Sequence, residues 1–248
     1  MQEVWRQSPL AGLRARDVIL VTDFDGTLSE IVSDPAQARI VPESLEALGL
    51  LAQRLRMVAV LSSRSLDDLQ TRVPLPRVQL IGDSGLGLVT ADERERLDRF
   101  NLEGGRLLNR YPGVWLEMKA GATAVHHRHS SASRDELMAT LQPAVDATGL
   151  RLQPGRRVIE VIPRDHAKGD ALEALISERQ PLGVVCIGDD ENDRPMFQLV
   201  AGLLIPHLTV GVTSSEVPED LFAGCDLVLS DPQEVSQFLA MLADWSAA

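Results

Sequence analysis

Two aspartates separated by one residue, Asp23 and Asp25, follow directly on the apolar run "VILVT", and Gly26 and Thr27 turn the chain at once. This spacing can send two carboxylates, or one carboxylate and one backbone carbonyl, toward the same point. Oxygen ligands of that kind suit Mg²⁺. A lone pair of this type is more often the polar end of a strand than a site, so other residues must support the interpretation.

Three further apolar stretches lead into hydroxyl, cationic or carboxylate side chains, which are Ser62, Ser63 and Arg64, then Lys168, then Asp189, Asp190 and Asp193. Taken singly, these residues could be a helix cap, a surface lysine and a solvated turn. Taken together, carboxylates gathered at one strand edge repel one another unless a cation lies among them. The set therefore favours Mg²⁺ accompanied by Lys168, and groups of this kind serve phosphoryl transfer.

The elements that would position these residues are short runs of Val, Ile and Leu that alternate with helical patterns, which indicates a parallel sheet buried on both faces. Helices are predicted after Pro42 and after Lys168. Ligands bind at the carboxyl ends of the strands in such sheets, where Asp23 lies. The predicted strands are 18–23, 57–62, 78–82 and 183–188, with weaker ones near 209–212 and 226–229.

The middle of the chain has a different pattern, because apolar and polar residues alternate over 114–119, 123–129 and 157–162. That period of two is typical of antiparallel strands with one wet face. A hairpin turn is predicted in "KAGATA", and 134–148 offers a covering helix that Pro143 interrupts. The predicted fold class is α/β, with a Rossmann-like parallel-sheet core formed by residues 1–86 and 164–248 and an inserted α+β cap domain at 87–163.

Composition excludes several classes of protein. The 248 residues are 44% hydrophobic, enough to bury a core, and the net charge of -12 argues against a nucleic-acid partner. No apolar run approaches the roughly 20 residues of a membrane span, and the N-terminal segment has no signal-peptide pattern, so no membrane partner and a cytoplasmic location are expected. Two distant cysteines are interpreted as reduced and structural. A monomer is favoured.

The ordered motifs resemble those of haloacid dehalogenase superfamily phosphatases: D-x-D-G-T at Asp23, then Ser62, then Lys168, then the acidic run from Asp189. The resemblance implies that Asp23 is the nucleophile and that Asp25 is the general acid and then the base. Ser62 and Lys168 would hold the phosphoryl oxygens. The implied magnesium ligands are Asp23, the backbone carbonyl of Asp25, and Asp189, with Asp193 nearby.

Within that superfamily the chain is most similar to trehalose-6-phosphate phosphatases. The segments that carry the resemblance are "LSSRSLDDL", "WLEMKAGATAVHHRH", "VIEVIPRDHAKGDAL" and "GDDENDRPMF". The family implies a sugar phosphate as substrate and an inserted domain that acts as a cap. The expected substrate-binding residues are Ser63, Arg64, Glu117, Lys119, His126, Arg128 and Glu160.

Three departures from the family pattern bear on the choice of substrate. Ser84 stands where a histidine is usual. The metal motif has Asn192 where threonine is usual and Arg194 where an acid is usual, and Ser63 replaces the usual glycine after Ser62. Trehalose 6-phosphate is the leading substrate, and phosphates of glucosylglycerol or mannosylglycerate type are the alternatives. A non-catalytic sugar-phosphate sensor and a sugar-phosphate mutase also stay open. A sensor has no need of a general acid, so an intact Asp25 favours an enzyme.

Overall fold

The computed structural model describes residues 1–85, 90–119, 121–155, 157–163, 168–214 and 217–247. It contains two compact units. The first joins Met1–Ser84 to Lys168–Ala248, and the second is Gly85–Ala167. The domain boundaries predicted at 86–87 and 163–164 include positions outside the described residues.

The first unit is built on a six-stranded sheet with the order β10-β9-β8-β1-β2-β3, and all neighbouring strands are parallel. Each of the six strands expected from the sequence is present, which confirms the predicted α/β class. Their bounds are β1 Val18–Thr22, β2 Met57–Leu61, β3 Gln79–Ile81, β8 Gly183–Gly188, β9 His207–Val212 and β10 Leu227–Leu229.

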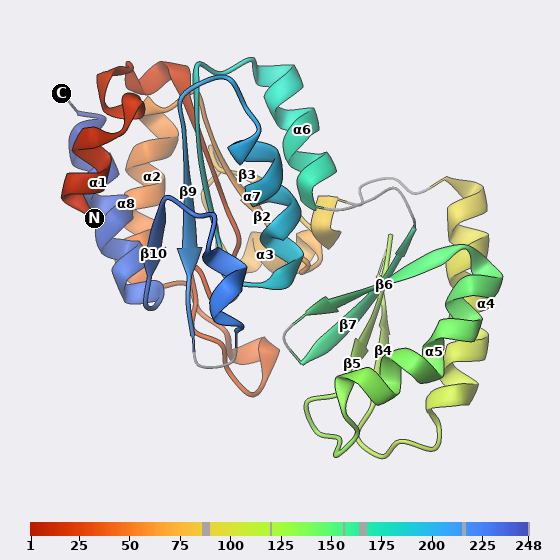
Figure 1. The fold of residues 1–248 in the computed structure, drawn as a ribbon. Coiled ribbons are helices and arrows are strands. Elements are labelled where there is room, and N and C mark those ends of the chain that lie inside the picture. Colours follow the sequence, from red (N-terminus) through yellow and green to blue (C-terminus); the bar gives the residue numbers. More distant parts are fainter. Residues whose placement is uncertain (86–89, 120, 156, 164–167, 215–216, 248) are drawn as a thin grey trace. The chain divides into compact units, whose positions relative to one another are not determined.

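Two hydrophobic clusters cover the two faces of this sheet, which explains why every residue of β1, β2 and β8 is buried. Helices α1, α2 and α8 pack on one face and α6 and α7 on the other (Figure 1). The helices of the first unit are α1 Gln2–Gln7, α2 Pro42–Arg54, α3 Leu66–Arg72, α6 Lys168–Arg179, α7 Arg194–Ala201 and α8 Pro232–Trp245.

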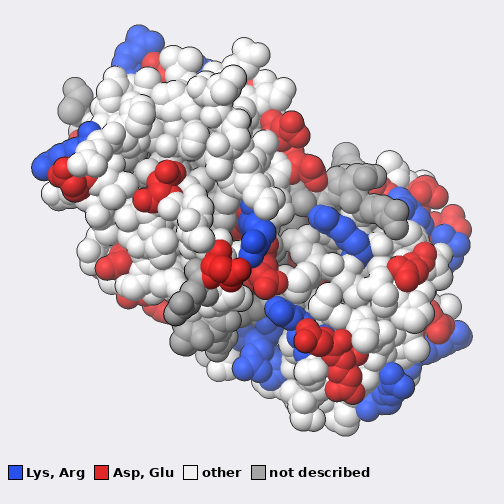
Figure 2. Space-filling view, viewed as in Figure 1, with Lys and Arg blue, Asp and Glu red and all other residues white. Residues whose placement is uncertain are grey.

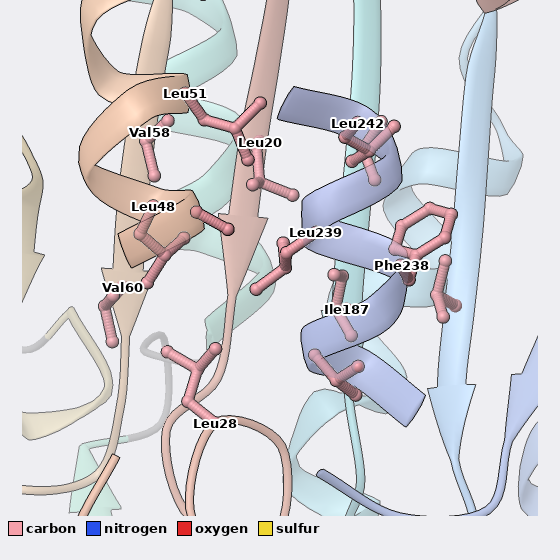
Figure 3. Close-up of a cluster of buried hydrophobic side chains, with 14 of the residues drawn as sticks. Leu20, Leu28, Leu48, Leu51, Val58, Val60, Ile187, Phe238, Leu239 and Leu242 are labelled. Atoms are coloured by element: carbon pink, nitrogen blue, oxygen red, sulfur yellow. The ribbon is translucent and has the colours of Figure 1, made fainter. Parts of the chain in front are cut away.

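Figure 3 shows how α2 and α8 close the first of these clusters. Leu48 and Leu51 of α2 and Leu239 of α8 are fully buried against the strands. Burial of each such side chain contributes about 1.5–3 kcal/mol relative to exposure. The two helices therefore hold β1 and β8 in place from this face, and the carboxyl ends of these strands carry the candidate site.

The second unit is an antiparallel sheet with the order β4-β5-β7-β6 and two helices on one face. Leu97 and Phe100 of α4 and Leu137 and Leu141 of α5 are buried in its core. The bounds are α4 Ala91–Leu108, β4 Trp115–Met118, β5 Thr123–His126, α5 Arg134–Thr148, β6 Leu150–Gly155 and β7 Val158–Pro163. The expected α+β character is thus present.

The structure corrects two expectations in this unit. The strand predicted over 123–129 ends at His126, because the chain turns there and Ser130 N donates to the His127 carbonyl. Arg128 consequently lies in a turn rather than on a strand face. Pro143 lies inside α5 without interrupting it, since the buried residues on either side, Leu141 and Ala144, pack the helix against the sheet.

Short 3₁₀ turns connect several of these elements: η1 Pro9–Gly12, η2 Ala15–Asp17, η3 Pro35–Gln37, η4 Asp83–Gly85, η5 Glu191–Asp193 and η6 Glu219–Phe222. The predicted hairpin between β4 and β5 includes residue 120, outside the described residues, but the two strands do pair antiparallel. Both cysteines, Cys186 and Cys225, are free thiols.

The face of the molecule shown in Figure 2 mixes charges of both signs. Figure 2 shows Lys and Arg scattered among Asp and Glu over the face in view, with no large area of one sign among the described residues. Such a face offers no continuous basic track for a phosphate backbone. Among the helices the structure describes, none combines the length and the apolar character that a membrane crossing requires.

Candidate active site

The candidate site lies at the carboxyl ends of the neighbouring strands β1 and β8, where the sheet is extended in opposite directions by successive strands. From the neighbouring pair β1 and β8, the sheet continues through β2 and β3 on one side and through β9 and β10 on the other. Loops at such a point diverge and leave a crevice at the carboxyl ends of the strands. Asp23 follows β1, its backbone N–H donates to the Ile187 carbonyl at 3.0 Å, and Asp189 follows β8.

Gly26 allows the Asp23 loop and the Asp189 side chain to approach closely. Its φ is 75°, in the left-handed region that favours glycine. A β-carbon at this position would lie 1.9 Å from Asp189 Oδ2. The turn that follows the two aspartates therefore makes room for a third carboxylate.

Lys168 lies fully buried at the start of α6, between two carboxylates. Its Nζ is 3.0 Å from Asp23 Oδ1 and donates to Asp193 Oδ1 at 2.7 Å. Asp193 Oδ2 accepts the backbone amides of Asp189 at 2.9 Å and of Asp190 at 3.1 Å. Asp193 thus ties the loop after β8 to the lysine, and it orients both.

The carboxylate charges of this cluster exceed the single positive charge of Lys168, so a further cation is needed to balance them. Asp23, Asp189 and Asp193 are buried, and one oxygen of each lies within 4.8 Å of the others. Three carboxylates and one ammonium group leave two negative charges in a buried site. Burial raises the pKa of Asp23 to about 7, Lys168 opposes this rise, and Asp193 and Asp25 add to it. Burial alone would lower the pKa of Lys168, but Asp193 and then Asp23 outweigh it and raise that pKa.

These donors fit a hard divalent cation. They are oxygens only, which suits Mg²⁺ rather than a soft metal. A divalent charge would cancel the two excess negative charges. Because both Asp193 oxygens already accept hydrogen bonds, Asp23 and Asp189 are the carboxylates we expect to reach the ion. The acidic triad could therefore bind a metal.

The loop after β2 brings a hydroxyl and a guanidinium to the same sheet edge. Ser62 is buried, and its Oγ accepts the backbone N–H of Arg64 at 3.2 Å. Its carbonyl accepts the backbone N–H of Ser84, a buried residue in the left-handed region with φ 56°. Ser63 is half-buried beside it. Ser62 and Ser84 are thus joined across the ends of β2 and β3.

Arg64 makes a two-pronged ion pair with Asp25. Its Nε donates to Asp25 Oδ2 at 2.6 Å and its Nη2 to Oδ1 at 2.7 Å. Asp68 on α3 accepts from Arg64 Nη1 at 2.6 Å. Burial opposes the guanidinium charge, but the Asp25 and Asp68 carboxylates outweigh it and raise the pKa of Arg64. Asp25 is therefore held by an arginine, whereas Asp23 is held by a lysine.

The antiparallel sheet of the second unit carries a row of polar side chains on the face opposite α4 and α5. Leu116, Val125 and Ile159 point toward the helices, so their strand neighbours point away. On that opposite face Lys119 Nζ donates to Glu160 Oε1 at 3.2 Å. His126 Nε2 lies 2.7 Å from Glu117 Oε2, and the His126 ring packs edge-on against Trp115.

The structure brings most of the predicted residues together in two groups. In the first unit these are Asp23, Asp25, Ser62, Ser63, Arg64, Lys168, Asp189 and Asp193, and in the second they are Glu117, Lys119, His126 and Glu160. Their individual roles stay predictions. Arg128 lies in the turn after β5, apart from the strand positions of the second group.

Two contributors were missed from the sequence. Asp68 forms an ion pair with Arg64, and the separation of four residues between them was the available signal. Trp115 packs on His126, and only the pairing register of β4 with β5 brings the two rings together. Asn192, one of the departures from the family pattern, is buried in η5, and Arg194 begins α7.

Curated relatives share the sequence over most of its length. The trehalose-phosphate phosphatase of Mycobacterium bovis is 34% identical over 250 residues, which covers 94% of this chain and 63% of the relative. That of Mycobacterium leprae is 32% identical over 253 residues, which covers 93% of this chain and 58% of the relative. The chain thus spans less than two thirds of the length of these relatives.

Solved structures share the fold. The C-terminal domain of trehalose-6-phosphate phosphatase from Candida albicans superposes with a TM-score of 0.73 at 20% identity, covering 98% of this chain and 94% of that one. A trehalose-6-phosphate phosphatase related protein gives 0.72 at 20% identity, covering 92% and 98%.

The family comparison covers both units described above. The family model of trehalose-phosphatases matches residues 21–99 and 105–221, a range that begins within β1 and includes the loops after β2 and β8 together with the sheet of the second unit. On this match, the chain belongs to the trehalose-phosphatase family.

Proposed function

We propose that the protein is a Mg²⁺-dependent phosphatase that releases inorganic phosphate from a sugar phosphate, with trehalose 6-phosphate as the leading substrate. The observation that carries the proposal is buried Asp23, paired with Lys168 inside an acidic triad at the switch point of the sheet. Family membership and the similarity to trehalose-phosphate phosphatases support the choice of substrate.

The chemistry follows from the two aspartates after β1. A carboxylate oxygen of Asp23 attacks phosphorus, the bond from phosphorus to the sugar oxygen breaks, and Asp25 supplies the proton that the leaving oxygen needs. A water molecule then attacks the phosphorus of the aspartyl phosphate and gives its proton to Asp25. Asp23 leaves as a carboxylate, and the second product is inorganic phosphate.

The remaining groups neutralise charge. Lys168 lies close enough to Asp23 to hold an oxygen of the transferring phosphoryl group, and the buried hydroxyl of Ser62 is proposed as a second donor. When bound, Mg²⁺ would supply further positive charge to those oxygens. Asp23, the backbone carbonyl of Asp25 and Asp189 would hold it.

The polar face of the second unit is the proposed sugar-recognition surface. Glu117, Lys119 and Glu160 present charged donors and acceptors there, and these groups can hydrogen-bond sugar hydroxyls. The exposed Trp115 adds an aromatic ring on the same face. Binding the part of the substrate remote from phosphorus would help to align the phosphoryl group.

A binding protein without activity is the second candidate. The fold also occurs in the C-terminal domain of a trehalose synthase regulatory protein from Candida albicans, which superposes with a TM-score of 0.69 at 14% identity. This chain has the proposed nucleophile Asp23, the proposed acid Asp25, Lys168 and the acidic triad, and a sensor would not need them. A mutase would use the same first step and pass the phosphoryl group back to a sugar.

The cytoplasmic location and the monomeric state stay predictions.

A panel of phosphorylated sugars tests the proposal. Trehalose 6-phosphate, glucosylglycerol phosphate, mannosylglycerate phosphate and glucose 6-phosphate are each incubated with the protein and Mg²⁺, and released phosphate is measured. We expect the highest kcat/KM with trehalose 6-phosphate. Binding of a sugar phosphate with no phosphate release would indicate the sensor, and isomerised sugar phosphate would indicate a mutase.

A further inference from the structure

We propose that Arg64 is a positioning residue for Asp25, and that its two-pronged pair fixes the Asp25 carboxylate in the plane in which protons are exchanged with the leaving oxygen and with water. The inference rests on the proposed function, because it takes Asp25 as the acid and base. It replaces the expectation that Arg64 binds the substrate directly.

The geometry of the pair determines the orientation of Asp25. Arg64 Nε and Nη2 contact the two oxygens of one carboxylate at 2.6 and 2.7 Å. A planar guanidinium that makes two parallel bonds fixes both the position and the plane of its partner, which a single point charge cannot do. Each carboxylate oxygen accepts at two lone pairs, so the pair leaves one on each oxygen for proton exchange.

Arg64 is itself held from three other directions. Its Nη1 donates to Asp68 on α3 at 2.6 Å, and its Nη2 donates to the Pro35 carbonyl at 3.0 Å. Its guanidinium lies 5.4 Å from the centre of the Phe24 ring. With the two bonds to Asp25, four of its five N–H donors are engaged. Its side chain is only 11% exposed.

Asp68 is in turn held by a second arginine, Arg72. Arg72 contacts both oxygens of Asp68, through Nε to Oδ2 and Nη2 to Oδ1, each at 2.8 Å, and it also donates to the Ala38 carbonyl. The pair from Arg64 to Asp25 therefore belongs to a chain of ion pairs anchored on α3 and on the loop before α2. Such a network restricts the rotamers of its members more than an isolated surface pair would.

The same contacts argue against Arg64 as a direct ligand of the phosphoryl group. To bind phosphate with two or more N–H donors, its guanidinium would have to leave Asp25 or Asp68, and it would leave a partly buried carboxylate without its cation. Losing such a partner is unfavourable. The cation that lies beside the nucleophile is Lys168, at 3.0 Å from Asp23. Lys168 is therefore the cation proposed to bind the phosphoryl group, and Arg64 is the cation proposed to position Asp25.

A double-mutant cycle with Asp25 tests the proposal. With Asp25 intact, Arg64→Ala should lower kcat for trehalose 6-phosphate by roughly 10- to 100-fold and change KM by less than about threefold. General acid–base catalysis is worth about 10²- to 10⁴-fold in rate, and a misaligned Asp25 would lose part of it. In an Asp25→Asn background, the same substitution should lower kcat less than about threefold further. Arg64→Lys, which keeps the charge but loses the fork, should fall between wild type and Arg64→Ala.

The matched control is Arg54→Ala. Arg54 is a partly buried arginine that donates to the Ala243 carbonyl at 2.8 Å and to Ser246 Oγ at 3.4 Å, at the end of α2 that precedes β2. Its loss removes a similar side chain at the opposite edge of the sheet. We expect kcat within about twofold of wild type, as for substitutions remote from the chemistry.

A crystal structure of Arg64→Ala supplies a readout that does not depend on activity. We expect the Asp25 carboxylate to occupy a changed rotamer or more than one. A raised KM with unchanged kcat, an equal loss of kcat in the Asp25→Asn background, or an unmoved Asp25 would overturn the proposal. Wild-type protein that releases no phosphate from any substrate of the panel would refute the proposed function instead, whatever the position of Asp25.

Discussion

Replacing the proposed nucleophile by its amide, Asp23→Asn, should abolish turnover and yet stabilise the metal-free protein above neutral pH. Burial raises the pKa of Asp23 from 3.8 to about 7, against the opposing effect of Lys168. A carboxyl group whose pKa is higher in the folded state contributes stability that is fully present below its unfolded pKa. That contribution is lost as the pH rises through the folded value. Asparagine has the shape of the protonated acid and never ionises, so the variant keeps the contribution.

The difference between 3.8 and about 7 sets the magnitude. Each tenfold change in proton affinity is worth about 1.4 kcal/mol, which gives roughly 4 kcal/mol as the upper limit at pH 8. Relaxation of the loop around the charge reduces the gain, and we expect about 2–4 kcal/mol. For a domain of roughly 150–250 residues this raises Tm by about 5–15 °C.

Thermal unfolding in EDTA at pH 4, 6 and 8 measures this gain. The gap between the variant and wild type should be nearly closed at pH 4 and widest at pH 8. Added Mg²⁺ should stabilise wild type more than the variant, because the ion binds only the folded state and its ligand has been removed. The control is Glu46→Gln, an exposed acid on α2, which should change stability by less than about 0.5 kcal/mol. Wild type that is as stable as Asp23→Asn in EDTA at pH 8 would refute the reasoning.

Three further predictions concern the metal, the turn and the sugar. EDTA should remove phosphatase activity and Mg²⁺ should restore it, whereas Asp189→Ala should not recover at ordinary Mg²⁺ concentrations; full activity in a metal-free preparation would contradict this. Gly26→Ala, whose new β-carbon would meet Asp189 Oδ2 at 1.9 Å with φ at 75°, should lower unfolding free energy by more than about 1 kcal/mol and weaken Mg²⁺ binding, measured by calorimetry; an unchanged metal affinity would oppose it. Glu117→Ala, Lys119→Ala and Glu160→Ala should each lose on the order of 1–3 kcal/mol of transition-state stabilisation with trehalose 6-phosphate and little with p-nitrophenyl phosphate. Equal losses of kcat/KM on both substrates would mean that these residues support the fold rather than bind the sugar.

The sequence was most informative where local pattern and burial coincide. The strands β1, β2 and β8 are buried on both faces and therefore appear as uninterrupted apolar runs, and their carboxyl ends could be located from the polar residues that follow. Asp23 and Asp189 were placed at one edge by this argument alone. The strands of the second unit were recognised from their period of two, except β6.

Contacts between distant residues were beyond such arguments. The pairs Lys168 with Asp193 and Arg64 with Asp25 join residues 25 and 39 positions apart, and they depend on which loops the strand order brings together. No local pattern distinguishes an arginine that holds a carboxylate from one that binds phosphate. The end of β5 at His126 was missed for a related reason, since alternation of residue types continues into the turn that contains Arg128.

The central claim is that Asp23 takes the phosphoryl group, and trapping the intermediate tests it most directly. Protein mixed with trehalose 6-phosphate and Mg²⁺ is quenched with sodium borohydride, which reduces an aspartyl phosphate to homoserine, and the peptides are sequenced by mass spectrometry. We predict homoserine at position 23, formed only when substrate and Mg²⁺ are both present, and none at position 25. Active enzyme that yields homoserine at another aspartate, or at none while substrate is being turned over and the trap is shown to work on a control acyl phosphate, would contradict the account.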